Sequence, residues 1–215
     1  MSAAPTPIAL GLRALKGGCV AVGVAVDDSG PRIVLSTFLA TASDGDRLSL
    51  EPYRVAFEMP RGAQGALAPG AGAAVADGRE RQRRLAAQRL DEVVRQLREA
   101  GCEPVVTALL ANRAGWSTEL LEHNLSAPEH VAVAEGLAVR DAFRQALGRA
   151  GVEVADVDEK TLPALASLCL DPPADARLKA LGATVGRPWR KEQKLACLAA
   201  WVTLIRAVGA TAAKP

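Results

Sequence analysis

The chain has 215 residues, of which 49% are hydrophobic, 23% are charged and only 3% are aromatic, and its formal net charge is +2. This charge gives no general attraction to nucleic acid or to an acidic membrane surface, and no apolar run approaches the ~20 residues that a membrane-spanning helix needs. The four cysteines are widely scattered without a Cys-x-x-Cys pair, which indicates reduced, buried thiols rather than zinc ligands or disulfides.

The first three predicted elements are β-strands joined by tight turns. They cover residues 8–12, 19–26 and 33–40. In the second strand Val20, Val22 and Val24 alternate with small residues, a period of two that is typical of a strand with one face packed by large side chains. Because turn residues occupy both connections, the pattern predicts an antiparallel meander. The preceding residues 1–7 lack the basic start and apolar core of a signal peptide, so we expect a disordered N-terminus and a cytoplasmic protein.

The middle of the chain changes from a loop to a helix. Residues 60–78 are rich in Gly and Ala, contain two prolines and show no periodicity, so we expect a flexible internal loop. Residues 79–100 show helical spacing, and Gly101 provides a stop. This helix holds seven Arg against four acidic residues, which fits either a phosphate contact or a solvated surface.

The second half alternates strands and helices. Residues 104–111 form a continuous apolar run that is typical of a strand buried on both faces. Pro128 starts a helix that runs to Ala150, with Ser126 as its predicted N-cap. A strand at 152–157, a short helix at 178–181 and a last helix from about residue 190 follow. We expect one domain over residues 8–208 and a disordered tail at 209–215.

This order of elements resembles the ribonuclease H-like fold, in its Holliday-junction-resolvase-like branch. Three local sequences support the resemblance: Ala9-Leu-Gly-Leu-Arg13 at the first strand, 134–140 with 151–154 at the central helix and next strand, and 191–201 at the final helix. The resemblance implies an α/β fold with a five-stranded mixed sheet, made of a three-strand antiparallel meander plus two parallel strands and flanked by helices.

The resemblance also implies where metal-binding acids belong. Members of this branch typically cut DNA or RNA with two magnesium ions held by acids of the first strand, the fourth strand and the last helix. Carried over, these positions fall at Arg13, near 110–112 and near Lys194 or Arg190, and none offers a carboxylate. Because hard cations need anionic oxygens, we expect neither a bound metal nor two-metal hydrolysis. A relocated acid such as Glu192 keeps a magnesium-dependent nuclease open as the alternative.

Glu135 is the best catalytic candidate, although no catalytic residue is identified. On the predicted helix its same-face neighbours include Val131, Ala138 and Val139, all apolar. A carboxylate in such a stripe needs a partner or stays protonated. It can form a buried ion pair with Arg13 or Arg140, or it can belong to a functional pocket.

Basic residues gather where the last helix begins. Arg190, Lys191 and Lys194 are expected to lie near Arg13, so this region either binds a phosphate or other anion or is a solvated run of charge. His123 and His130 are not expected to bind metal, because Pro128 interrupts a helix between them.

The sequence therefore predicts a catalytically degenerate protein that acts by binding. Its expected binding residues are Arg13, Glu135, Arg190, Lys191 and Lys194. Its expected partner is a phosphate-bearing or other anionic ligand, nucleic acid or a protein, and no membrane. The alternative is a metal-dependent nuclease with relocated acids.

Overall fold

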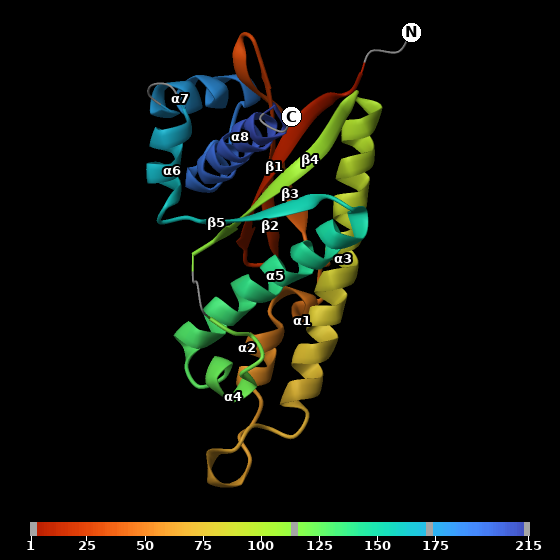
Figure 1. The fold of residues 1–215 in the computed structure, drawn as a ribbon. Helices are drawn as coiled ribbons and strands as arrows, with labels where there is room; N and C mark the ends of the chain where they lie inside the picture. The colour runs from red at the N-terminus through yellow and green to blue at the C-terminus, as the bar shows by residue number, and fades with distance from the viewer. Residues whose placement is uncertain (1–3, 113–115, 171–173, 213–215) are drawn as a thin grey trace.

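Five strands form one mixed sheet in a computed structural model that describes residues 4–112, 116–170 and 174–212 (Figure 1). The strands are β1 (Thr6–Leu15), β2 (Gly18–Asp27), β3 (Gly30–Ala40), β4 (Cys102–Ala111) and β5 (Glu153–Asp158). Their order is β3-β2-β1-β4-β5, with antiparallel pairing of β1 to β2 and of β2 to β3. β4 pairs in parallel with both β1 and β5. The predicted meander plus two parallel strands is confirmed.

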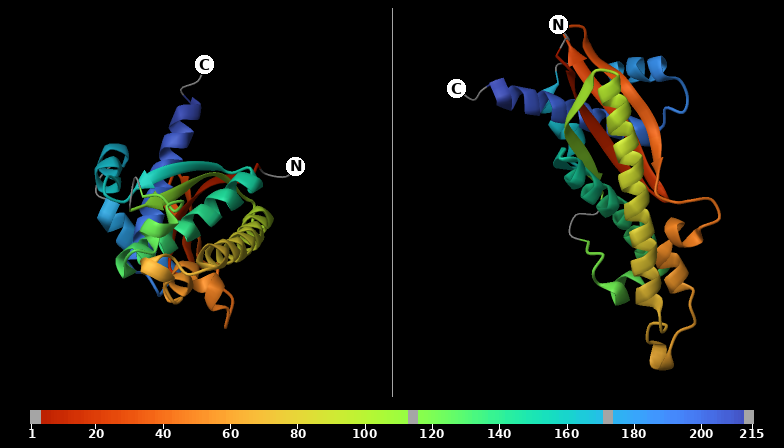
Figure 2. Two further views of the ribbon diagram at one scale, coloured as in Figure 1. Left: turned by 90° about the horizontal axis from the view of Figure 1, so that it is seen from below. Right: turned by 90° about the vertical axis from the view of Figure 1, so that its right-hand side faces the viewer.

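Alternation along β1 divides the core between the two faces of the sheet. Ile8, Leu10 and Leu12 are fully buried on the face that α3 (Ala71–Glu99) and α5 (Pro128–Ala150) cover. Ala9 faces the other way, in the core that α8 (Lys191–Ala212), α6 (Leu162–Cys169) and α7 (Ala174–Val185) complete. The further views show the sheet between these two groups of helices (Figure 2). Helices cover both faces, as expected.

Gly11 allows α8 to lie directly on β1. A Cβ atom built on Gly11 would come within 1.9 Å of the backbone oxygen of Ala196, so no other residue fits without moving the helix. The next residue on the same face of β1 is Arg13, because side chains two apart along a strand share a face. The start of α8 therefore meets Arg13.

The helix α3 begins earlier than predicted. It starts at Ala71, so the expectation of a loop is wrong for residues 71–78. Alanine has the highest helix propensity, which favours this start despite the neighbouring glycines. Gly78 is needed on this turn, since a Cβ there would lie 2.4 Å from Cβ of Pro52.

Several helices of three to eight residues were not predicted, because one or two turns carry too little periodicity. They are α1 (Arg47–Leu50), α2 (Pro52–Phe57), η1 (Ala63–Gly65), α4 (Leu121–Asn124) and α6. The helix α7 is also longer than the four residues expected at 178–181. Tyr53 of α2, Val75 of α3 and Leu125 pack with α5 in a third small core beyond the end of the sheet.

The predicted bounds of α5 are correct, but its N-cap is not. The helix starts at Pro128 and ends at Gly151, whose φ of 69° suits glycine. Ala127 is the N-cap, and the Ser126 hydroxyl instead donates to the backbone oxygen of His123 at 2.7 Å.

The termini are more ordered than expected. β1 includes residues 6 and 7, and α8 continues to Ala212, so the predicted disorder is wrong for residues 6–7 and 209–212. Within the described part of the chain, every helix is too short or too polar to cross a lipid bilayer.

Candidate functional site

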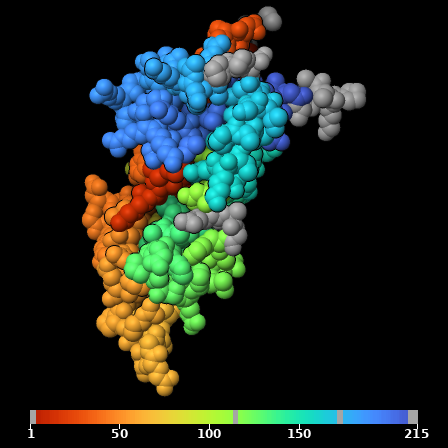
Figure 3. Space-filling view, turned by 90° about the vertical axis from the view of Figure 1, so that its left-hand side faces the viewer, coloured from red at the N-terminus to blue at the C-terminus, as the bar shows by residue number. Residues whose placement is uncertain are grey.

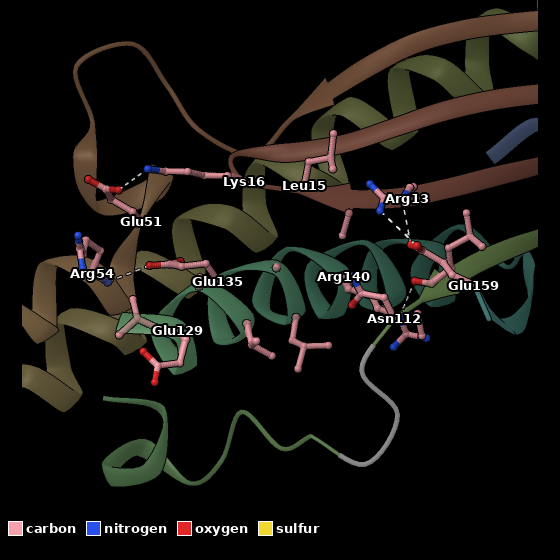
Figure 4. Close-up of a pocket in the computed structure, with 18 of the residues that line it drawn as sticks. Arg13, Leu15, Lys16, Glu51, Arg54, Asn112, Glu129, Glu135, Arg140 and Glu159 are labelled. Carbon is pink, nitrogen blue, oxygen red and sulfur yellow. Dashed lines mark hydrogen bonds and ion pairs between the residues drawn. The ribbon is translucent and has the colours of Figure 1, made fainter. Parts of the chain in front are cut away.

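A cleft of about 680 Å³ lies where the end of β1 meets α2 and α5. In the space-filling view the end of β1, in red, reaches the surface between the blue C-terminal helices and the green part of α5 (Figure 3). Charged residues of both signs line the cleft: Arg13, Lys16, Arg54, Arg140, Glu51, Glu129, Glu135 and Glu159. They come from segments far apart in the sequence (Figure 4).

Arg13 occupies one end of this cleft and is held by two carboxylates. Its Nε donates to Oε1 of Glu159 at 2.9 Å and its Nη2 donates to Oε2 at 3.2 Å. A third cationic nitrogen, Nη1, lies 3.8 Å from a carboxylate oxygen of Glu192 in the first turn of α8. The side chains of Arg13 and Glu159 are 13% and 15% exposed, so this is a largely buried, bidentate ion pair.

These residues do not fit a magnesium site. The relocated acid considered from the sequence, Glu192, does approach Arg13, and Glu159 joins it. Both carboxylates, however, face a guanidinium, which repels a divalent cation from the space between them. Within the described residues no group of three or more His, Cys, Asp or Glu side chains is arranged to hold a metal ion.

A second guanidinium, that of Arg140, lies at the carboxyl end of β4. Its Nε donates to the backbone oxygen of Leu110 at 3.0 Å, and its Nη2 pairs with Asp156. Arg144 pairs with the same carboxylate. The carboxyl end of β4, near which the resemblance implies a second acid, is therefore in contact with a cation that is only 13% exposed.

The predicted binding residues separate into two groups. Arg13 and Glu135 line the cleft, whereas Arg190, Lys191 and Lys194 do not. All three of these basic residues are exposed, and none has a carboxylate within salt-bridge distance among the described residues. Lys160 joins them as a further exposed cation without such a partner, directly after Glu159. Lys160 follows Glu159, and Arg190, Lys191 and Lys194 lie on either side of Glu192 in the sequence. Glu159 and Glu192 both contact Arg13, so the four basic residues belong to the segments that meet there.

Glu135 caps the start of α2 and forms no ion pair with arginine. Its Oε1 accepts the backbone N–H of Arg54 at 2.9 Å, whereas its Oε2 is buried without a hydrogen-bond partner. The expected pairing with Arg13 or Arg140 is wrong, because the N-terminus of α2 lies closer. Burial raises the pKa of Glu135 to about 7, although the hydrogen bond from the backbone N–H of Arg54 opposes the rise.

The two histidines come together in spite of the break in the helix. As predicted, Pro128 begins a new helix after α4 ends at Asn124. The rings of His123 and His130 nevertheless lie 4.4 Å apart between centroids, and Trp116 packs against both. The Trp116 indole N–H donates to Oδ1 of Asn124 at 2.9 Å, which anchors this aromatic group beside the start of α5.

Sequence reasoning missed Glu159, Lys16, Glu51 and Arg54. A signal for Glu159 was present, because it follows β5, and the carboxyl ends of parallel strands meet at one edge of a sheet. The other three depend on α2 and on the turn before β2, where no pattern predicted a contact with α5.

Comparison with known proteins supports the fold alone and does not identify a function. No protein-family model and no curated protein sequence matches the chain. Among solved structures, RuvC of Thermus thermophilus matches with a TM-score of 0.54 at 13% identity, over 95% of this chain and 97% of that chain. The same values hold for T. thermophilus RuvC in complex with a Holliday junction substrate. The yeast mitochondrial Holliday junction resolvase Ydc2 has a TM-score of 0.47 at 9% identity, over 97% of this chain and 83% of that chain. The two RuvC matches show that the fold of this chain is ribonuclease H-like.

Proposed function

We propose that this chain binds nucleic acid through its phosphates and does not cleave it by metal-dependent hydrolysis. The observation that carries the proposal is the bidentate pair of Arg13 with Glu159 at the carboxyl end of the parallel strands. Two-metal hydrolysis needs carboxylates that are free to bind cations. In this chain the carboxylates of Glu159 and Glu192 already neutralise the guanidinium of Arg13.

Exposed basic residues supply the contact with phosphate. Lys160, Arg190, Lys191 and Lys194 flank the segments that carry Glu159 and Glu192. Since they have no carboxylate partners among the described residues, their charge is available to an anionic ligand. The small net charge of the chain limits the affinity and makes it sensitive to salt. The RuvC structure with a Holliday junction shows that this fold can accommodate DNA in that protein.

Fluorescence anisotropy with labelled single-stranded, duplex and four-way-junction DNA tests the proposal. We expect binding that weakens as salt increases, without DNA cleavage in either magnesium or manganese. The double variant Lys191→Ala/Lys194→Ala should lower the affinity about tenfold and reduce the salt slope by about two.

Arg84→Ala/Arg149→Ala is the matched control, because it removes two exposed positive charges away from this surface. Equal effects of the two double variants would contradict phosphate binding at the surface formed by Lys160, Arg190, Lys191 and Lys194. Metal-dependent cleavage that Glu192→Gln abolishes would establish instead a nuclease with a relocated acid.

A further inference from the structure

The end of the cleft remote from Arg13 contains an unsatisfied hydrogen-bond acceptor. Glu135 is only 6% exposed, and its Oε2 has no hydrogen-bond partner. The other oxygen, Oε1, accepts a backbone N–H at the start of α2. A buried acceptor without a partner costs free energy that an incoming donor can recover. The residue lines the cleft, so a ligand there lies beside it (Figure 4).

The basic side chains at this end of the cleft are paired with carboxylates other than Glu135. Lys16 pairs with Glu51 at 2.5 Å, and Arg54 pairs with Glu58 at 3.1 Å. Arg47 bridges the two carboxylates, so three cations share two acidic partners. With these cations engaged by other carboxylates, Oε2 of Glu135 remains available to an uncharged donor.

The side chains at the mouth of this end can move to admit a ligand. Lys16 is 61% exposed and Arg54 is 41% exposed, and both are long and flexible. Ala132 and Gly136 of α5 also line the cleft, and a Cβ built on Gly136 would meet no other atom within 4 Å. A volume of about 680 Å³ is within the range of small-ligand sites.

We propose that this end of the cleft receives an unpaired nucleobase that carries an exocyclic amino group, which donates a hydrogen bond to Oε2 of Glu135. The inference rests on the proposed function, since it takes nucleic acid as the ligand. It adds a preference among bases, which phosphate contacts alone do not give. Lys16 and Arg54 are then placed to contact the phosphates that flank the base.

Cytosine and thymine separate this inference from general binding, because one has an amino group where the other has a carbonyl oxygen. We expect oligodeoxycytidine of about twelve nucleotides to bind about fivefold more tightly than oligodeoxythymidine of the same length. In Glu135→Gln the amide oxygen can keep the bond to Arg54, and the amide nitrogen then replaces Oε2 with a donor. This variant should lose the preference for cytosine or reverse it.

Glu99→Gln is the control, because it removes one surface carboxylate of α3 that pairs only with Arg95. It should leave the ratio of the two affinities unchanged. Thermal melting of each variant, followed by circular dichroism, verifies that the fold persists. The comparison of the two oligonucleotides in the unmodified protein needs no variant.

Free cytidine and uridine, compared by saturation-transfer NMR, distinguish failure of this inference from failure of the proposed function. Equal binding of both oligonucleotides and of both nucleosides overturns the base site and leaves phosphate binding intact. Preferential binding of cytidine without any oligonucleotide binding supports the base site and overturns the proposed function. Absence of binding by all four probes overturns both.

Discussion

Arg13 and Glu159 lie 146 residues apart in the sequence, and their side chains form two hydrogen bonds, at 2.9 and 3.2 Å. Arg13 belongs to β1, and Glu159 follows β5, so the pair crosses the end of β4, which lies between these strands. Glu192 adds the first turn of α8 to the same guanidinium. The pair therefore ties together three segments at the edge of the sheet where the cleft opens.

Removing only one member of this pair should destabilise the protein more than removing both. Arg13→Met leaves the Glu159 carboxylate largely buried without its main partner, and we expect a loss of about 3 kcal/mol in the free energy of unfolding. Arg13→Met/Glu159→Leu replaces the pair with apolar side chains and should recover most of that loss. Urea titrations of both variants and of the unmodified protein measure the difference. Additive losses would contradict the pairing.

Exchanging Arg13 for an acid should create a metal site at this end of the cleft. Arg13→Asp brings a third carboxylate beside Glu159 and Glu192, and clustered carboxylate oxygens bind hard cations. At a manganese concentration about tenfold above the dissociation constant, the variant should gain about 1.4 kcal/mol in stability. The unmodified protein should gain nothing, and Arg13→Asn controls for the change in size. Equal stabilisation of the unmodified protein and of Arg13→Asp would show that the guanidinium does not exclude the metal.

Glu135 should make the stability of the protein depend on pH. Burial raises the pKa of Glu135 from its ordinary 4.5 to about 7, so the folded chain holds this proton more tightly than the unfolded chain. The resulting stabilisation is complete below about pH 4.5 and is lost as the pH rises through 7, with a total of about 3 kcal/mol. Glu135→Gln should abolish this component, so its stability relative to the unmodified protein should rise between about pH 5 and pH 8. Denaturation midpoints across that range check it, with Glu129→Gln as an exposed control on α5. Parallel pH profiles of the unmodified protein and Glu135→Gln would refute this assignment.

Gly11→Ala should strongly destabilise the protein. The added methyl group would lie 1.9 Å from the backbone oxygen of Ala196, and α8 must shift away from β1 to accept it. Overpacking of this kind costs about 1–3 kcal/mol. Gly148→Ala is the matched control, because it lies in α5 with open space around it and should stabilise the helix by about 0.5–1 kcal/mol. Similar melting temperatures for the two variants would count against the close packing of α8 on β1.

The sequence by itself determined much of the secondary structure. The alternation of Val20, Val22 and Val24 with small residues gave the second strand and its faces, and Pro128 and Gly151 gave the limits of α5. These predictions succeed because steric preferences and side-chain periodicity act between residues that are near one another in the chain. The sequence also predicted Arg13 on the first strand, where the resemblance implies an acid.

Only the tertiary structure decided which groups these charges meet. Glu135 was expected either to pair with Arg13 or Arg140 or to belong to a pocket. It lines the cleft and caps α2, a helix of six residues that the sequence pattern did not predict. Arg13 meets Glu159 because the parallel strands end at a common edge, and it meets Glu192 because Gly11 lets α8 approach the sheet. Such contacts depend on how whole elements pack, and packing is set by the fit of surfaces that distant parts of the chain contribute.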